Sequence, residues 1–311
     1  MKKIFICTFA LLLSIVVFSS CESENETDMT VDDELSELQA SLEKLNSEIA
    51  ASLDVIPTRG PNDKDIDKQK KEKDTVTVVL TDAMGALEGA AAGSQILGSA
   101  GTFTIPVIGT VTGATLGGIL GGIFVGAASS WVAWHSQDNP AIQGRMNLPM
   151  HEIDNVLTFE NMTICFGRIL DLHHFCDTTA IGPTEVQDIV NIAGIHNRML
   201  DEMGNSQFTG CYTSIEPDTA LYNTVKPLKA HYEGLKSTPF PYDIHSAVCK
   251  IFEYFYNSFS TCVKSKKEAK VIVERYLEYV NTCNEVTETE RVNLLFAIAT
   301  AWHSYNYWTK F

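Results

Sequence analysis

The clearest hydrophobic pattern near the start of the chain is a row of apolar residues spaced by three or four positions. The row consists of Leu35, Leu38, Leu42, Leu45, Ile49 and Leu53. This spacing is close to the a/d seam of a coiled coil and predicts a helix that begins after Thr30 and ends before Pro57. Three heptads form only a weak coiled coil. We therefore expect a helical stalk or a helix packed on its own protein, with self-association through the seam as the alternative.

The next segment, residues 59–74, carries charged side chains of both signs and has almost nothing to bury. That composition is typical of a solvated linker. Residues 75–81 have the sequence Thr-Val-Thr-Val-Val-Leu-Thr. This short run predicts an edge strand or the extended lead into a helix. Residues 21–74 are thus expected to form an acidic tether, a short amphipathic helix and a charged linker.

Residues 82–134 differ from the rest of the chain, since no Asp, Glu, Lys or Arg occurs from Gly89 to Trp134. Glycine recurs at every fourth position in two sets, Gly85, Gly89 and Gly93, then Gly109, Gly113, Gly117 and Gly121. A second ridge consists of Gly118, Gly122 and Gly126. Glycine weakens a helix by roughly 1 kcal/mol relative to alanine. Its regular spacing therefore indicates two helices that approach each other closely.

The glycine pattern predicts a helical hairpin within residues 75–140, with arms at 83–98 and 107–134 and a turn near Pro106. The second arm, about 28 residues long, could cross a hydrocarbon layer of about 30 Å. Trp131 and Trp134 stand at its end, where aromatic anchors meet a membrane interface. Glu88 in the shorter arm disfavours permanent burial of that arm in lipid.

Helical periodicity continues through residues 141–311 and predicts a C-terminal helical bundle. Thr184 is the expected start of a helix that runs to about Met203, and another begins at Asp243. Capping boxes are expected where Ser265 precedes Glu268 and where Thr287 precedes Glu290. In the last helix the spacing of Trp302 and Tyr305 favours core packing over a stacking platform for sugars. The predicted fold class is all-α.

The first twenty residues have the pattern of an export signal. Lys2 and Lys3 precede an apolar run from Ile4 to Phe18, and Phe18-Ser19-Ser20-Cys21 follows. This ending resembles the lipobox of bacterial lipoproteins, although Phe18 replaces the usual Leu. The resemblance implies cleavage before Cys21 and acylation of its thiol. The acidic residues 22–26 resemble the surface-export signal of some Gram-negative lipoproteins, which implies an outer-membrane lipoprotein on the cell surface.

The net charge of the chain limits which binding partners are expected. Removal of residues 1–20 leaves 21 basic and 39 acidic residues, a formal charge of −18. A chain this acidic is not expected to bind nucleic acid or anionic headgroups. Attachment to a membrane must therefore come from acyl chains and apolar surface.

Six cysteines follow Cys21, and all lie in the C-terminal half. An exported protein can keep them oxidised, so disulfides are favoured over buried thiols. If helices 243–264 and 266–284 are antiparallel, Cys249 and Cys283 fall at similar heights, which predicts a disulfide between them. Cys249 and Cys262 lie too far apart along one helix to pair.

Motifs for catalysis or cofactor binding are weak throughout. Asp171, His174 and Cys176 are the densest set of metal-ligating types, but their spacing matches no established metal motif. A Cys/His hydrolase built from Cys176 and His196 has no local support. The chain contains no nucleophile elbow, Walker loop or dinucleotide fingerprint. We therefore expect a non-catalytic protein with no metal and no cofactor.

Three functions remain as expectations. The glycine-rich segment resembles the hydrophobic hairpins of bacteriocins and other glycine-zipper membrane proteins. This resemblance implies a hairpin that associates with a membrane, in the envelope or as an antibacterial agent. Alternatively the hairpin packs tightly on the helical domain of a lipid-anchored envelope protein. In the third case the fold is fully soluble and its surface binds a protein or glycan ligand.

Overall fold

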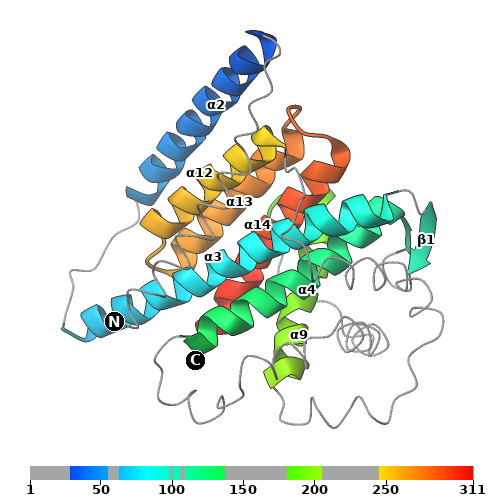
Figure 1. The fold of residues 1–311 in the computed structure, drawn as a ribbon. Coiled ribbons are helices and arrows are strands. Elements are labelled where there is room, and N and C mark those ends of the chain that lie inside the picture. Colours follow the sequence, from blue (N-terminus) through cyan, green and yellow to red (C-terminus); the bar gives the residue numbers. More distant parts are fainter. Residues whose placement is uncertain are drawn as a thin grey trace, which may run out of the picture.

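The computed structural model describes residues 29–54, 63–98, 101–105, 109–136, 181–204 and 245–310. Over this part of the chain the fold is all-α, as predicted, with one short β-hairpin (Figure 1). Residues 1–28, with the signal segment and Cys21, lie outside the described residues, as do Asp171, His174 and Cys176.

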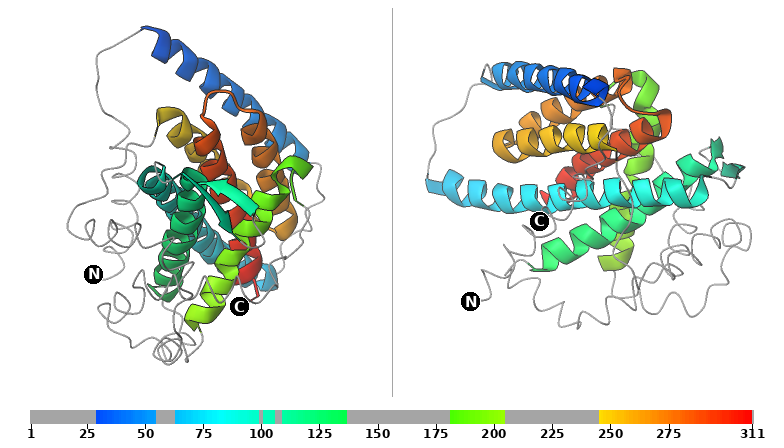
Figure 2. Two further views of the ribbon diagram at one scale, coloured as in Figure 1. Left: turned by 90° about the vertical axis from the view of Figure 1, so that its right-hand side faces the viewer. Right: turned by 45° about the horizontal axis from the view of Figure 1, so that its top comes forward.

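Helix α2 (Met29–Asp54) is part of the bundle rather than a stalk. It lies along α12 (Ser246–Cys262) and α13 (Lys266–Thr282) (Figures 1 and 2). The seam residues Leu38, Leu42, Leu45 and Ile49 are buried. Polar contacts flank them, including Tyr276 Oη donating to Asn46 Oδ1 at 2.7 Å and an Arg275–Glu48 ion pair at 2.7 Å. Of the alternatives predicted for this seam, the helix packed on its own protein is confirmed, since helices of the same chain cover the seam.

Helix α3 (Asp63–Leu97) begins well before the predicted hairpin arm. Residues 63–74, predicted as a linker, and residues 75–81, predicted as a strand or extended lead, are both helical. Val76, Val79, Leu80 and Ala83 are buried at helical spacing. The short alternating run fitted either period, and burial against the rest of the protein selected the helix.

A small β-hairpin separates the two arms. Strands β1 (Thr102–Ile105) and β2 (Gly109–Thr112) are antiparallel, with Thr102 opposite Thr112. Thr112 Oγ1 then accepts a hydrogen bond from Thr115 N at 3.1 Å and caps α4 (Gly113–Ser136). The second arm therefore begins at Gly113 instead of residue 107. Gly109 lies in a strand, outside the predicted helical ridge.

The C-terminal part forms the rest of the bundle. Its elements are η1 (Thr184–Val186), α8 (Gln187–Ala193), α9 (Ile195–Gly204), α12, α13 and α14 (Glu288–Trp308). The capping box of Thr287 and Glu290 is confirmed. Ser265 caps α13, but the Glu268 carboxylate accepts from Lys264 N rather than from Ser265 N.

Helix α14 is the centre of the molecule, and it packs against both arms of the hairpin and against α8, α9 and α13 (Figure 2). Trp302 and Tyr305 are each 1% exposed, so these aromatic side chains belong to the core. A contiguous set of buried apolar side chains extends from α2 through the hairpin to α14. The hairpin and the C-terminal helices therefore share one core.

The predicted Cys249–Cys283 disulfide is wrong. Cys283 is a buried free thiol whose Sγ donates to Glu285 Oε2 at 3.0 Å, and Cys262 is also free. Cys283 follows the last residue of α13 in an extended conformation, and its side chain turns to the following loop instead of α12. No disulfide joins two of the described cysteines.

Candidate functional site: a glycine seam and a buried ion pair

The two arms of the hairpin meet along their glycines. A Cβ on Gly89 would lie 2.6 Å from the carbonyl carbon of Gly121, and nearer still to its oxygen. A Cβ on Gly93 would meet Gly117 in the same way, and one on Gly85 would lie 2.8 Å from Ser129 Cβ. We call Gly85, Gly89, Gly93, Gly117 and Gly121 the glycine seam. These distances leave no room for a side chain, so α3 and α4 touch through their backbones.

The second glycine ridge of α4 also permits close contacts. A Cβ on Gly122 would lie 2.7 Å from the ring of Phe296 on α14. At Gly118 the space is taken by the side chains of Ser94 and Asn293, whose Oγ and Oδ1 atoms are 3.1 Å apart. The two faces of α4 thus hold the hairpin together and seat it on α14.

A buried polar cluster joins the hairpin to the C-terminal helices. Asp82 on α3 and His196 on α9 are both fully buried, and Asp82 Oδ1 lies 2.6 Å from His196 Nε2. Ser130 on α4 and Ser304 on α14 are also 0% exposed, and their hydroxyls contact the Asp82 carboxylate. We call these four residues the polar node. Since the Asp82 oxygens, both serine hydroxyls and His196 Nε2 make no well-directed hydrogen bond, burial and the short ionic contact define the node.

Two opposing effects act on the Asp82 carboxyl. Burial removes water from it and raises its pKa, which is the largest effect. His196, Ser304 and Ser130 act in the opposite direction because they stabilise the ionised form. The net effect is a raised pKa, so the Asp82 carboxyl keeps its proton to higher pH than a carboxyl in water.

The polar node contains Ser, His and Asp, but its arrangement differs from that of a nucleophilic triad. In a triad the histidine contacts the serine. Here both serines contact Asp82, and the other ring nitrogen of His196, Nδ1, lies 3.3 Å from Asn197 Oδ1. All four node side chains are closed off from solvent, so the arrangement can hold a proton and tie helices together.

Sequence reasoning missed the polar node, although a signal for Asp82 was present. Asp82 precedes Gly85, Gly89 and Gly93 by helical steps of three and four, so it shares their buried face. A carboxylate on such a face needs a buried partner. Nothing local in the sequence identifies His196 as that partner.

Two tryptophans stack one helical turn beyond the node. Trp134 and Trp308 have ring centroids 4.3 Å apart and an interplanar angle of 23°. They follow Ser130 and Ser304 by four residues each. Trp134 is 8% exposed, so this predicted membrane anchor is instead packed against α14.

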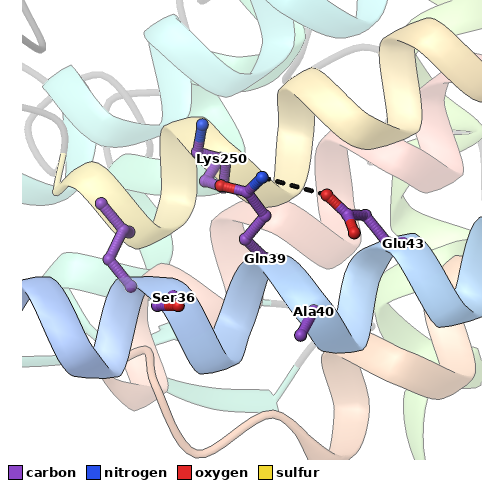
Figure 3. Close-up of a pocket in the computed structure, with 6 residues that line it drawn as sticks. Ser36, Gln39, Ala40, Glu43 and Lys250 are labelled. Carbon is purple, nitrogen blue, oxygen red and sulfur yellow. Dashed lines mark hydrogen bonds between the residues drawn. The ribbon is translucent and has the colours of Figure 1, made fainter.

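A shallow groove lies on the surface between α2 and α12 (Figure 3). Its lining consists of Leu35, Ser36, Gln39, Ala40, Glu43 and Lys250. Gln39 Nε2 donates to Glu43 Oε1 at 3.0 Å, and Lys250 lies 3.6 Å from Glu253. The charges of the groove are thus already partnered within the protein.

Within the described ranges, no group of three or more His, Cys, Asp or Glu side chains is placed to hold a metal ion. In the same part of the chain, no helix combines the length and apolarity needed to cross a membrane. Comparison of the chain with protein-family models, with curated proteins and with solved structures gives no match.

Proposed function

We propose that this protein is a lipid-anchored, non-catalytic envelope protein of the cell surface, with its glycine hairpin folded against its own helical bundle. The proposal that the hairpin is folded against the bundle rests on the close fit between them. The glycine seam brings α3 and α4 into backbone contact. Because Gly122 has no side chain, the Phe296 ring of α14 packs directly against α4 at this position. The surfaces that would drive the hairpin into a bilayer are thereby used within the chain.

The support for the anchor is the Phe18-Ser19-Ser20-Cys21 sequence and the charge of the chain beyond it. At a formal charge of −18 the mature chain is repelled by anionic headgroups. Acyl chains on Cys21 would supply affinity for the membrane.

The test of the anchor is metabolic labelling with a fatty-acid analogue in a Gram-negative host that expresses the full chain. We expect the label on the wild-type protein and not on Cys21→Ser, and protease added to intact cells should digest the labelled protein. An unlabelled wild-type chain that keeps its first twenty residues would overturn the anchor. A labelled chain that protease reaches only after lysis would overturn surface exposure.

A second candidate function is that of a bacteriocin-like membrane-active protein. The observation that favours it is α4, which runs from Gly113 to Ser136 without Asp, Glu, Lys or Arg. If the hairpin leaves the bundle, protein lacking residues 1–21 should release dye from neutral liposomes. If the hairpin stays packed, vesicles should remain intact, and we expect this result at neutral pH.

A further inference from the structure

The polar node is the one place where a fully buried titratable pair links the hairpin to the rest of the described bundle. Asp82 lies on the first arm and Ser130 on the second, while His196 and Ser304 lie on α9 and α14. Any change in the charge of this pair acts directly on the attachment of both arms. The node is buried on all sides, so water cannot screen such a change unless the helices separate.

The geometry fixes how many protons the pair can hold. His196 Nδ1 faces Asn197 Oδ1 at 3.3 Å, which is satisfied when Nδ1 carries a hydrogen and donates it to the amide oxygen. His196 Nε2 and Asp82 Oδ1 are then 2.6 Å apart and need one further proton between them. With that proton the pair is neutral overall. Without it, the neutral ring has one hydrogen for two acceptors, Asn197 Oδ1 and Asp82 Oδ1, and a carboxylate remains in a dry site.

We propose that the Asp82–His196 pair is a one-proton lock that keeps the glycine hairpin attached to the bundle and releases it when alkali removes the proton. This inference goes beyond the lipid anchor and does not depend on it. The direction of the pH dependence follows from the linkage between proton binding and folding. In the unfolded chain the pair loses its last proton near the ordinary histidine value of about 6.5. In the folded protein, burial raises the pKa of the Asp82 carboxyl and so opposes loss of the shared proton, and the contribution of the pair to stability declines as pH rises above that value.

The helices that form the node also carry other titratable groups. Helix α4 contributes Ser130 and no Asp, Glu, Lys or Arg. On α9, Arg198 is half-buried and Asp201 is exposed. On α14, His303 is buried with Nε2 2.8 Å from the Val190 carbonyl oxygen, and on α3 Glu88 lies about two turns from Asp82. His303 and Glu88 are the two groups that the test must separate from the lock.

Hydrogen exchange of the full chain in non-ionic detergent tests the lock between about pH 6.5 and 9, with rates corrected for intrinsic exchange. Peptides from α3 and α4 should lose protection by up to about tenfold per pH unit, the limit for one proton. Peptides from α13 should not change over this range. The near-ultraviolet circular dichroism of the Trp134–Trp308 stack should fall in parallel. A hairpin whose protection does not depend on pH would overturn the proposal.

Variants assign the proton to this pair. Asp82→Asn combined with His196→Gln in a Glu88→Gln background keeps polar groups at the node and removes the titration of Glu88 as well, so its hairpin protection should be independent of pH. Glu88→Gln and His303→Gln are the matched controls and should retain the decline. A decline that survives in the triple variant, or disappears in either control, would place the proton elsewhere and refute the lock.

A measurement on the wild-type chain covers the case in which the triple variant does not fold. The NMR shift of the Asp82 side-chain carboxyl carbon should change at the upper end of the pH range over which α3 and α4 lose protection. Ser130→Ala removes a hydroxyl that favours the carboxylate, so its decline should continue to higher pH than that of the wild-type protein. An Asp82 carboxyl that titrates below the pH range of the opening, or a Ser130→Ala variant whose decline ends at lower pH than in the wild-type protein, would contradict the proposal.

Discussion

Substitution of Gly89 by alanine tests the glycine seam, because helix propensity and packing predict opposite signs. Propensity alone favours alanine by about 1 kcal/mol in a helix. In the folded protein the new Cβ would lie 2.6 Å from the carbonyl carbon of Gly121. Ordinary contact begins at about 3.4 Å, and the obstructing atoms are backbone, which cannot rotate away. The arms would have to separate.

The expected loss of unfolding free energy follows from helix propensity and from the steric clash. Overpacking in a well-packed core costs typically about 1–3 kcal/mol, and a backbone clash belongs at the upper end. After the gain in propensity, Gly89→Ala should lose about 2 kcal/mol of unfolding free energy. Urea titration followed by circular dichroism measures this loss through the midpoint at constant slope.

Two companion variants make the result interpretable. Ala91→Gly, on the half-buried outer face of α3, should lose about 1 kcal/mol through propensity alone. Gly121→Ala should behave as Gly89→Ala does, and the double variant should lose less than the sum because both side chains force the same separation. A Gly89→Ala protein that is more stable than wild type by about 1 kcal/mol would refute close packing at the seam.

Three further predictions concern single side chains. Burial raises the pKa of Glu88 to about 7, so its stability contribution is full below the unfolded value and is lost as pH rises through about 7. Glu88→Gln should therefore raise the urea midpoint at pH 8, by about 1–3 kcal/mol in free energy, and change little at pH 4. Burial also raises the pKa of the Cys283 thiol to about 12, so a maleimide at neutral pH should modify half-buried Cys262 and reach Cys283 only after unfolding. Thr287→Ala should lower the unfolding free energy by about 1 kcal/mol in the same titration, since it removes the cap of α14, and an unchanged midpoint would show that the cap is redundant.

Local patterns predicted much of this fold. The spacing of Leu38, Leu42 and Ile49 specified which face of α2 is buried, and the capping residues of α14 specified where it begins. The spacing of Gly85, Gly89 and Gly93 at every fourth residue specified the face of α3 that meets α4. Each of these signals is contained within a few turns of one helix.

Features that depend on distant parts of the chain could not be predicted in the same way. Helix α2 has a seam that would suit a second copy equally well, and only the tertiary structure shows that α12 and α13 cover it. The pairing of Asp82 with His196 joins helices separated by long stretches of sequence. The disulfide prediction failed because helix length fixes the height of Cys283 but not the direction that its side chain takes after α13 ends.

The place of the hairpin when the protein is on a membrane is tested most directly by tryptophan quenching with brominated lipid. The full chain carrying Trp131→Phe, reconstituted in brominated phosphatidylcholine vesicles at neutral pH, retains Trp134, Trp302 and Trp308 as reporters. All three are less than 10% exposed in the folded protein. If the hairpin stays folded against the bundle, the fluorescence should be the same as in vesicles of unbrominated lipid. Strong quenching by the brominated lipid would mean that the hairpin has left the bundle for the bilayer, and would contradict the account.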